Sequence, residues 1–139
     1  MALPVTDFVV NGRDYKTTLL PARAGLILMP KIIALLGREN TTIMLAAGEK
    51  GLAKLLANPE TMGAMLHEIS TKATEDNGLL LLHEVMRHTT CKQIQASESV
   101  VEASVYDNFD THFAGDYLDL FTVAIHAARA SFTKPSSAK

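Results

Sequence analysis

Two groups of side chains in this sequence are of types that bind metal ions. The first is the pair His83 and His88, which flank Glu84 in a stretch expected to be helical. A zinc-binding helix needs its two histidines four residues apart, so that both imidazoles face one ion. Histidines five residues apart point about 140° away from each other around a helix axis. The spacing therefore argues against a zinc site at this position.

The second group combines carboxylates with a histidine: Asp107, Asp110, His112 and Asp116. Such a set can hold a divalent cation. It is not a calcium loop, because the turn glycine and the closing glutamate of that loop are missing. Helix capping and solubility explain these residues more simply. A small metal-dependent enzyme that uses Asp107, Asp110 and His112 is the less favoured alternative.

The sequence lacks the other common signatures of chemistry. It has no glycine-rich phosphate turn, no P-loop and no nucleophile elbow. Cys91 is the only cysteine, so we expect a buried structural thiol and no intrachain disulfide. The basic residues form no patch for nucleic acid, and the longest apolar runs, such as Leu79–Leu82, are far too short to span a bilayer. The N-terminus does not have the pattern of a signal peptide. We expect no enzyme activity, no cofactor, no nucleic-acid partner and no membrane partner.

Charge is distributed unevenly along the chain, although its formal net charge is only -2. Residues 1–92 hold ten basic and nine acidic side chains, whereas residues 93–128 hold six acidic side chains and none that is basic. Six of the eight Phe and Tyr residues fall in the overlapping stretch of residues 104–132, at Tyr106, Phe109, Phe113, Tyr117, Phe121 and Phe132. This segment is either a solvated acidic face, which is the simpler interpretation, or a docking surface for a basic partner.

The N-terminal residues have the pattern of a β-hairpin over about residues 6–18. Asn11-Gly12 lies between two alternating segments, and this dipeptide is the strongest two-residue hairpin signal because both turn positions need positive φ. An isolated hairpin is only marginally stable in water. We therefore expect it to pack on helices or to find a third strand, for which residues 90–95 are the candidate.

The rest of the chain is mostly helical by its apolar period. A first helix runs from Pro21 to a stop at Gly37, and Pro30 is expected to kink or divide it. The other helices are expected over residues 42–57, from Asn58-Pro59 to a loop at residues 75–78, over residues 79–88, and from Asp116 to Phe132. Residues 97–103 are the least defined part of the chain. The predicted fold class is α+β and predominantly α-helical, with the hairpin packed on a bundle of about four to five helices. We expect one domain over residues 1–132 and a disordered tail over residues 133–139.

Two blocks of sequence together resemble a known family. The first is Phe8-Val-Val-Asn-Gly-Arg-Asp-Tyr-Lys followed by Leu20-Pro-Ala-Arg-Ala-Gly-Leu and a helix that ends at Gly37. The second is Asn108-Phe-Asp-Thr-His-Phe-Ala-Gly-Asp-Tyr, followed by an amphipathic helix. In this order the blocks resemble the small tail assembly chaperones of long-tailed bacteriophages, in which the second block opens the last helix.

The resemblance implies a non-enzymatic protein without a cofactor. Such chaperones bind the tape measure protein in the cytoplasm of the infected bacterium while the tail tube assembles, and they leave before the virion is complete. The tail tube protein is a further expected partner, and self-association is plausible. The alternative is a permanent structural component of a phage tail or baseplate, such as a completion or initiator protein.

Two sets of residues are the candidates for partner binding. The first is the apolar face of the first helix, formed by Leu26, Met29, Ile33 and Leu36. The second is the aromatic and acidic segment, formed by Phe109, Asp110, Phe113, Asp116, Tyr117 and Phe121. For each apolar residue taken singly, a place in the core is the competing interpretation. The unusual width of the apolar face on the first helix favours some exposed, partner-binding surface.

Overall fold

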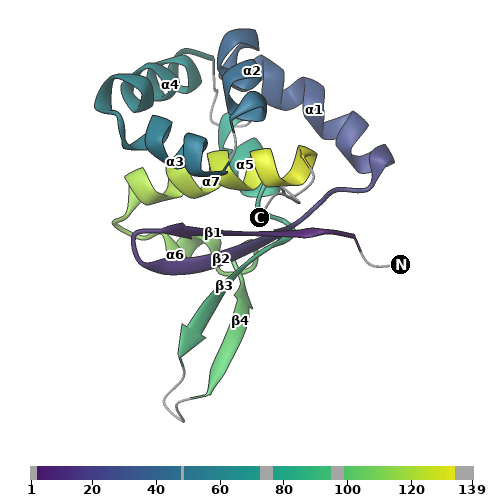
Figure 1. Ribbon diagram of the computed structural model, residues 1–139, viewed down its shortest axis with the longest axis vertical. Coiled ribbons are helices and arrows are strands. Elements are labelled where there is room, and N and C mark those ends of the chain that lie inside the picture. Colours follow the sequence, from purple (N-terminus) through teal and green to yellow (C-terminus); the bar gives the residue numbers. More distant parts are fainter. Residues whose placement is uncertain (1–2, 48, 73–76, 95–98, 134–139) are drawn as a thin grey trace.

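The computed structural model describes residues 3–47, 49–72, 77–94 and 99–133. Over these residues the chain forms a four-stranded antiparallel sheet of order β1-β2-β3-β4 and seven helices (Figure 1). The elements, in chain order, are β1 (Val5–Val10), β2 (Arg13–Thr18), α1 (Ala22–Leu36), α2 (Arg38–Ala46), α3 (Glu49–Ala57), α4 (Pro59–Lys72), α5 (Asn77–Glu84), β3 (Thr89–Ile94), β4 (Val100–Ser104), α6 (Phe109–His112) and α7 (Tyr117–Phe132). The predicted class, α+β and mainly helical, is confirmed.

The N-terminal hairpin is confirmed at the predicted place. Asn11 and Gly12 form its turn with φ angles of 52° and 77°, the left-handed values that this dipeptide tolerates. Alternate residues of β1 are buried, and Phe8 stacks on Tyr15 across the hairpin with ring centroids 5.5 Å apart. This aromatic pair fixes which face of the hairpin points to the core.

The sheet is larger than the sequence predicted. β3 pairs with β2 over Thr89–Cys91, so the third strand is confirmed, although residue 95 of that prediction lies outside the described residues. β4 pairs over its whole length with Thr90–Ile94 of β3. The prediction that residues 97–103 are the least defined part of the chain is therefore wrong from residue 100 onward, because the backbone edge of β3 pairs with these residues despite their polar composition. Beyond Cys91 the pairing with β2 ends, and the β3–β4 ribbon projects from the body of the molecule (Figure 1).

α7 lies between the sheet and the layer of helices α1 to α4 (Figure 1). Nine successive residues of α7, from Val123 to Ser131, are buried. On the sheet side, the His126 ring stacks on Phe8 with centroids 4.9 Å apart. On the other side, α7 contacts α1, α2, α3 and α5 (Figure 1). A helix covered on both sides explains why its small residues, such as Ala124 and Ala128, are in the core.

The first helix ends at Gly37, as predicted, and continues through Pro30 without being divided. The predicted single helix over residues 42–57 is wrong, since two helices, α2 and α3, occupy this region. The break is at Ala47, whose backbone is extended with φ -73° and ψ 138°. The guanidinium of Arg129, from α7, donates a 2.6 Å hydrogen bond through Nε to the Ala47 carbonyl. This bond satisfies a carbonyl at the end of α2, where a cation also complements the helix dipole.

The remaining helix boundaries match the sequence in part. α4 begins at Pro59 as predicted, because the Asn58 side chain accepts hydrogen bonds from the backbone N–H groups of Glu60 and Thr61. The helix predicted over residues 79–88 is wrong at both ends, since α5 spans Asn77–Glu84 and turns lead from it into β3. The expected loop over residues 75–78 is likewise wrong for residues 77–78, and residues 75–76 are not described.

The segment expected to open the last helix instead forms a separate short helix, α6. Gly115, with φ 81°, separates α6 from α7. α7 then ends at Phe132, as predicted. Residues 134–139 of the predicted tail lie outside the described residues.

Candidate functional site

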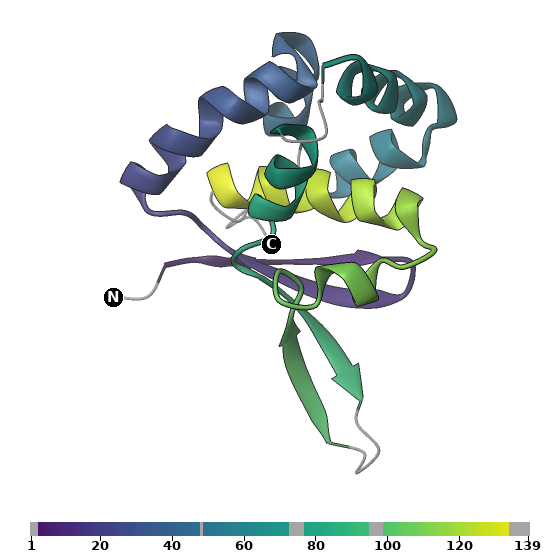
Figure 2. The same cartoon turned by 180° about the vertical axis from the view of Figure 1, so that it is seen from behind.

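An apolar groove opens between α1 and α5. Its volume is about 740 Å³, within the range of ordinary ligand-binding sites. Figure 2 shows α5 in front of α7 and beside α1. The groove is lined by Leu20, Ala24, Ile27, Leu28, Lys31, Ala34, Leu35, Leu80, Leu81, His83, Glu84, Val85, Arg87, His88, Tyr106 and Ser131.

One wall of the groove is a stripe along α1. The lining residues of this helix recur every three or four positions from Ala24 to Leu35, so they share one face of the helix. Leu28 and Leu35 are buried at the base of the wall, whereas the side chain of Ile27 is 62% exposed. At 1.5 Å per residue the stripe is about 16 Å long, or about three helical turns.

The opposite wall comes from α5 and the turn that follows it. Leu80 is 65% exposed, Leu81 packs against the core and Val85 is buried. Both walls of the groove therefore carry an exposed apolar side chain, Ile27 on one and Leu80 on the other. Sequence reasoning missed the α5 wall. Its signal was the run Leu79–Leu82, which is too rich in leucine for a short helix to bury entirely.

The rim of the groove is polar, and several of its side chains are held in place by hydrogen bonds to one another. The Arg87 guanidinium donates hydrogen bonds of 2.6 and 2.8 Å to the two carboxylate oxygens of Glu84 and one of 3.0 Å to the Tyr106 hydroxyl. It also lies over the Tyr106 ring, 4.4 Å from the centroid. The hydrogen bond from Arg87 is the main reason that the pKa of Glu84 is lowered. His83 donates through Nε2 to the Tyr106 carbonyl at 2.8 Å and stacks on the same ring.

A second, smaller cavity is lined mostly by polar side chains, one of which, His112, is hydrogen-bonded to the sheet. It measures about 470 Å³ and is lined by Arg13, Cys91, Lys92, Gln93, Asn108, Thr111 and His112. Burial raises the pKa of the Tyr15 hydroxyl to about 12, so this hydroxyl donates to His112 Nε2 at 2.8 Å. Burial, and then the charge of Arg13, lower the pKa of His112. His112 is therefore a neutral acceptor that joins α6 to the sheet.

The candidate catalytic and metal-binding side chains do not converge. Across the part of the chain that the structure describes, no three His, Cys, Asp or Glu side chains gather where they could hold a metal ion. Cys91 is buried, as predicted, and burial raises the pKa of its thiol, which disfavours the reactive thiolate.

Comparison with known families gives this apolar groove its context. A sequence profile described as "Phage tail assembly chaperone protein, TAC" matches residues 11–135. The chain belongs to the phage tail assembly chaperone family. No match was found among curated proteins or among solved structures. The family that the two sequence blocks indicated is thus confirmed over most of the chaperone's length.

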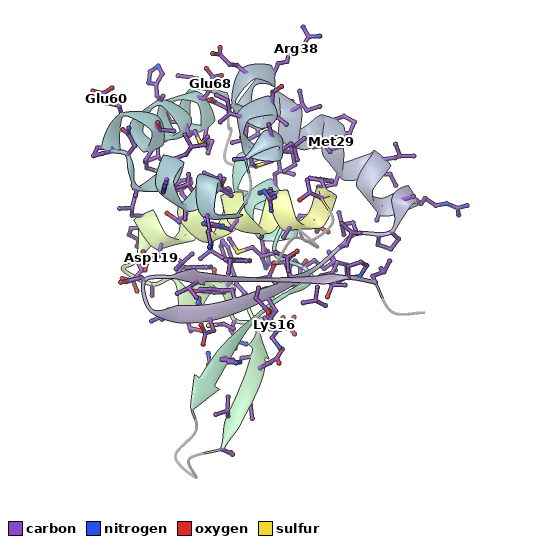
Figure 3. The ribbon with its side chains drawn as sticks, viewed as in Figure 1. Lys16, Met29, Arg38, Glu60, Glu68 and Asp119 are labelled. Atoms are coloured by element: carbon purple, nitrogen blue, oxygen red, sulfur yellow. The ribbon has the colours of Figure 1, made fainter. Side chains whose placement is uncertain are left out.

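In the chaperone, the four residues of the first candidate set lie partly at the surface and partly in the core. Leu26 is 77% exposed and Ile33 is 39% exposed, whereas Met29 is half-buried and Leu36 is only 3% exposed. Figure 3 shows Met29 on α1 in the helical layer. Leu26 directly precedes Ile27 of the groove wall, so the exposed apolar surface of α1 continues from the groove around the helix. Leu36 belongs to the core.

The second candidate set is divided in the same way. Phe109 and Phe113 are buried in the chaperone core and meet edge to face, with centroids 5.6 Å apart. Phe121 is half-buried against the same core. Asp110, Asp116 and Tyr117 are exposed. The nearby Asp119 accepts a 3.0 Å hydrogen bond from Asn11 at the β1–β2 turn, where Figure 3 shows it.

In the described residues of the chaperone, no helix is long and apolar enough to cross a membrane.

Proposed function

We propose that this chaperone acts without catalysis and binds the tape measure protein in the cytoplasm of the infected bacterium. The observation that carries the proposal is the apolar groove between α1 and α5, together with the exposed side chains of Leu26, Ile27 and Leu80 around it. Family membership places the protein in phage tail assembly. The groove supplies a surface on which an apolar segment of a tail protein can be held until the tube encloses it.

The physical basis of the proposal is the cost of exposed apolar surface. Contiguous apolar patches are uncommon on soluble monomers and mark sites of association. A tape measure protein is long, helical and apolar in places, so unassembled copies expose surface of the same kind. Covering that surface with a groove lowers the free energy of both partners, because apolar area leaves water on each side.

Co-expression with the tape measure protein of the same genome tests the proposal. We expect the tape measure protein to be insoluble when expressed alone and to co-purify with the chaperone as a soluble complex, whose mass light scattering measures. Tail tube protein added to this complex tests the second expected partner. An insoluble tape measure protein beside a chaperone that elutes alone would contradict the proposal. Detection of the protein in purified virions would instead support the alternative of a permanent tail component.

A further inference from the structure

We infer that the groove selects an amphipathic helix of about three turns whose polar flank carries a carboxylate opposite Lys31. The identity of the client rests on the proposed function. The shape and charge of the site rest on the groove itself. Three features carry the inference: the helical walls, the length of the α1 stripe and the unbalanced charge on the rim.

The walls of the groove favour a helical ligand over an extended one. α1 and α5 pair their backbone groups within themselves, so neither wall offers a row of free N–H and C=O groups to an added strand. A ligand that enters an apolar groove must satisfy its own backbone, and a helix does so internally. The stripe from Ala24 to Leu35 is about 16 Å long, which matches four apolar anchors at positions i, i+3 or i+4, i+7 and i+11 of a partner helix.

The charge on the rim favours an acidic partner. No Asp or Glu occurs between Asp14 and Glu39, so α1 contributes only positive charge. Lys31 lies in the middle of the α1 wall and is exposed, and among the described residues it makes no ion pair within 4.0 Å. Among the described residues that line the groove, Glu84 is the carboxylate, and Arg87 already neutralises it. A carboxylate on the partner would therefore meet an uncompensated ammonium group, which favours both docking rate and register.

Binding of overlapping peptides tests the apolar part of the inference. Fluorescent 20-residue peptides that cover the tape measure protein are titrated with the full-length chaperone, and fluorescence anisotropy gives Kd. Ile27→Asp and Leu80→Asp are expected to weaken binding of the best peptide by about tenfold or more, because each places a charge in the apolar groove. The matched control is Leu118→Asp, since Leu118 is 58% exposed but lies at the start of α7 and does not line the groove.

Exchanging the charges of Lys31 and of the peptide tests whether the groove prefers an acidic partner. Lys31→Glu is expected to weaken binding by roughly three- to tenfold at low salt and less at high salt. Arg23→Glu is the control on the same helix, because Arg23 is exposed and does not line the groove. Replacing the acidic residues of the peptide by Lys should restore its affinity for the Lys31→Glu variant. Circular dichroism of the bound peptide should show helix.

The outcomes separate the inference from the proposed function. If the wild-type chaperone binds neither the tape measure protein nor its peptides, the proposed function fails. If it binds the protein but Ile27→Asp and Leu80→Asp bind as tightly as Leu118→Asp, the groove is not the site and the inference is overturned. A wild-type dimer that Leu80→Asp dissociates without a client would assign the groove to a second copy and would also overturn it.

Discussion

Protonation of His126 is expected to destabilise the chaperone below neutral pH. Its side chain is 5% exposed on α7 and stacks on Phe8 of the sheet. Burial, and then the nearby charge of Arg129, lower the pKa of His126 from 6.5 to about 4. The folded state therefore keeps this imidazole neutral at pH values where the unfolded chain binds a proton.

The sign and size of the effect follow from this difference in pKa. Between pH 6.5 and about 4 the unfolded state binds more protons, so the free energy of unfolding falls as the pH falls through this window. With the two pKa values, the loss between pH 7.5 and pH 4.5 is about 2.5 kcal/mol. Folded domains are typically stable by roughly 5–15 kcal/mol, so this loss is a substantial fraction of the total.

Urea denaturation followed by far-ultraviolet circular dichroism measures this loss, since the chain has no tryptophan. His126→Phe is the informative variant, because it keeps a ring against Phe8 and removes the titration. We expect wild type and His126→Phe to have similar midpoints at pH 7.5, and the variant to be more stable by about 2.5 kcal/mol at pH 4.5.

Other titrating groups cancel in this comparison. The pKa of His112 is lowered by burial, and that of Glu84 by its hydrogen bond with Arg87, so both also weaken the fold as the pH falls. They are present in wild type and variant alike. If the two proteins lost stability in parallel between pH 7.5 and pH 4.5, the assignment of this pH dependence to His126 would be refuted.

Three further predictions concern stability, and urea denaturation measures each. Thr17→Val removes one partner of the buried 2.7 Å hydrogen bond between the Thr17 and Thr89 hydroxyls, and it should lower the free energy of unfolding by about 1–3 kcal/mol. The double variant Thr17→Val/Thr89→Val should recover part of this loss, because it leaves no unpaired hydroxyl. A double variant that is no more stable than the single one would contradict this prediction. Leu52→Ala, at a fully buried site, should lower the free energy of unfolding by about 2–5 kcal/mol. Leu118→Ala, at an exposed site, should change it by less than about 0.5 kcal/mol. Equal effects of the two substitutions would place Leu52 outside the core. Asn58→Ala removes the cap of α4 and should lower the free energy of unfolding by about 1 kcal/mol, whereas Asn58→Asp should keep both the cap and the stability. Equal losses in the two variants would rule out a capping role for Asn58.

The elements that sequence predicted best are those with local causes. The hairpin follows from Asn11-Gly12, whose φ angles need no tertiary contact to be favoured. The end of α1 at Gly37 and the start of α4 after Asn58 follow from capping in the same way. In each case the residue that determines the structure lies within a few positions of the structure it determines.

The elements that sequence missed depend on distant partners. β4 is a strand because β3 lies beside it, and the polar composition of residues 97–103 gave no sign of that edge. The break between α2 and α3 at Ala47 is stabilised by Arg129, which is 82 positions away in the chain. A periodic pattern that continues from one helix into the next cannot show where such a contact interrupts it.

The residues of the candidate site could not be predicted for the same reason. Apolar side chains occur on most of the surface of α1, so the sequence alone does not show which of them are exposed. Leu28 and Leu35 face the core, whereas Leu26 and Ile27 face solvent, and all four have the same type of side chain. The elements packed against α1 decide the difference, because α2, α4, α5 and α7 each contact part of this helix and leave a groove between it and α5. Composition therefore predicted that α1 carries more apolar surface than a core needs. The packing of the other helices against α1 determines which of its residues line the groove, and a change that moves α5 would alter the groove without any substitution in α1.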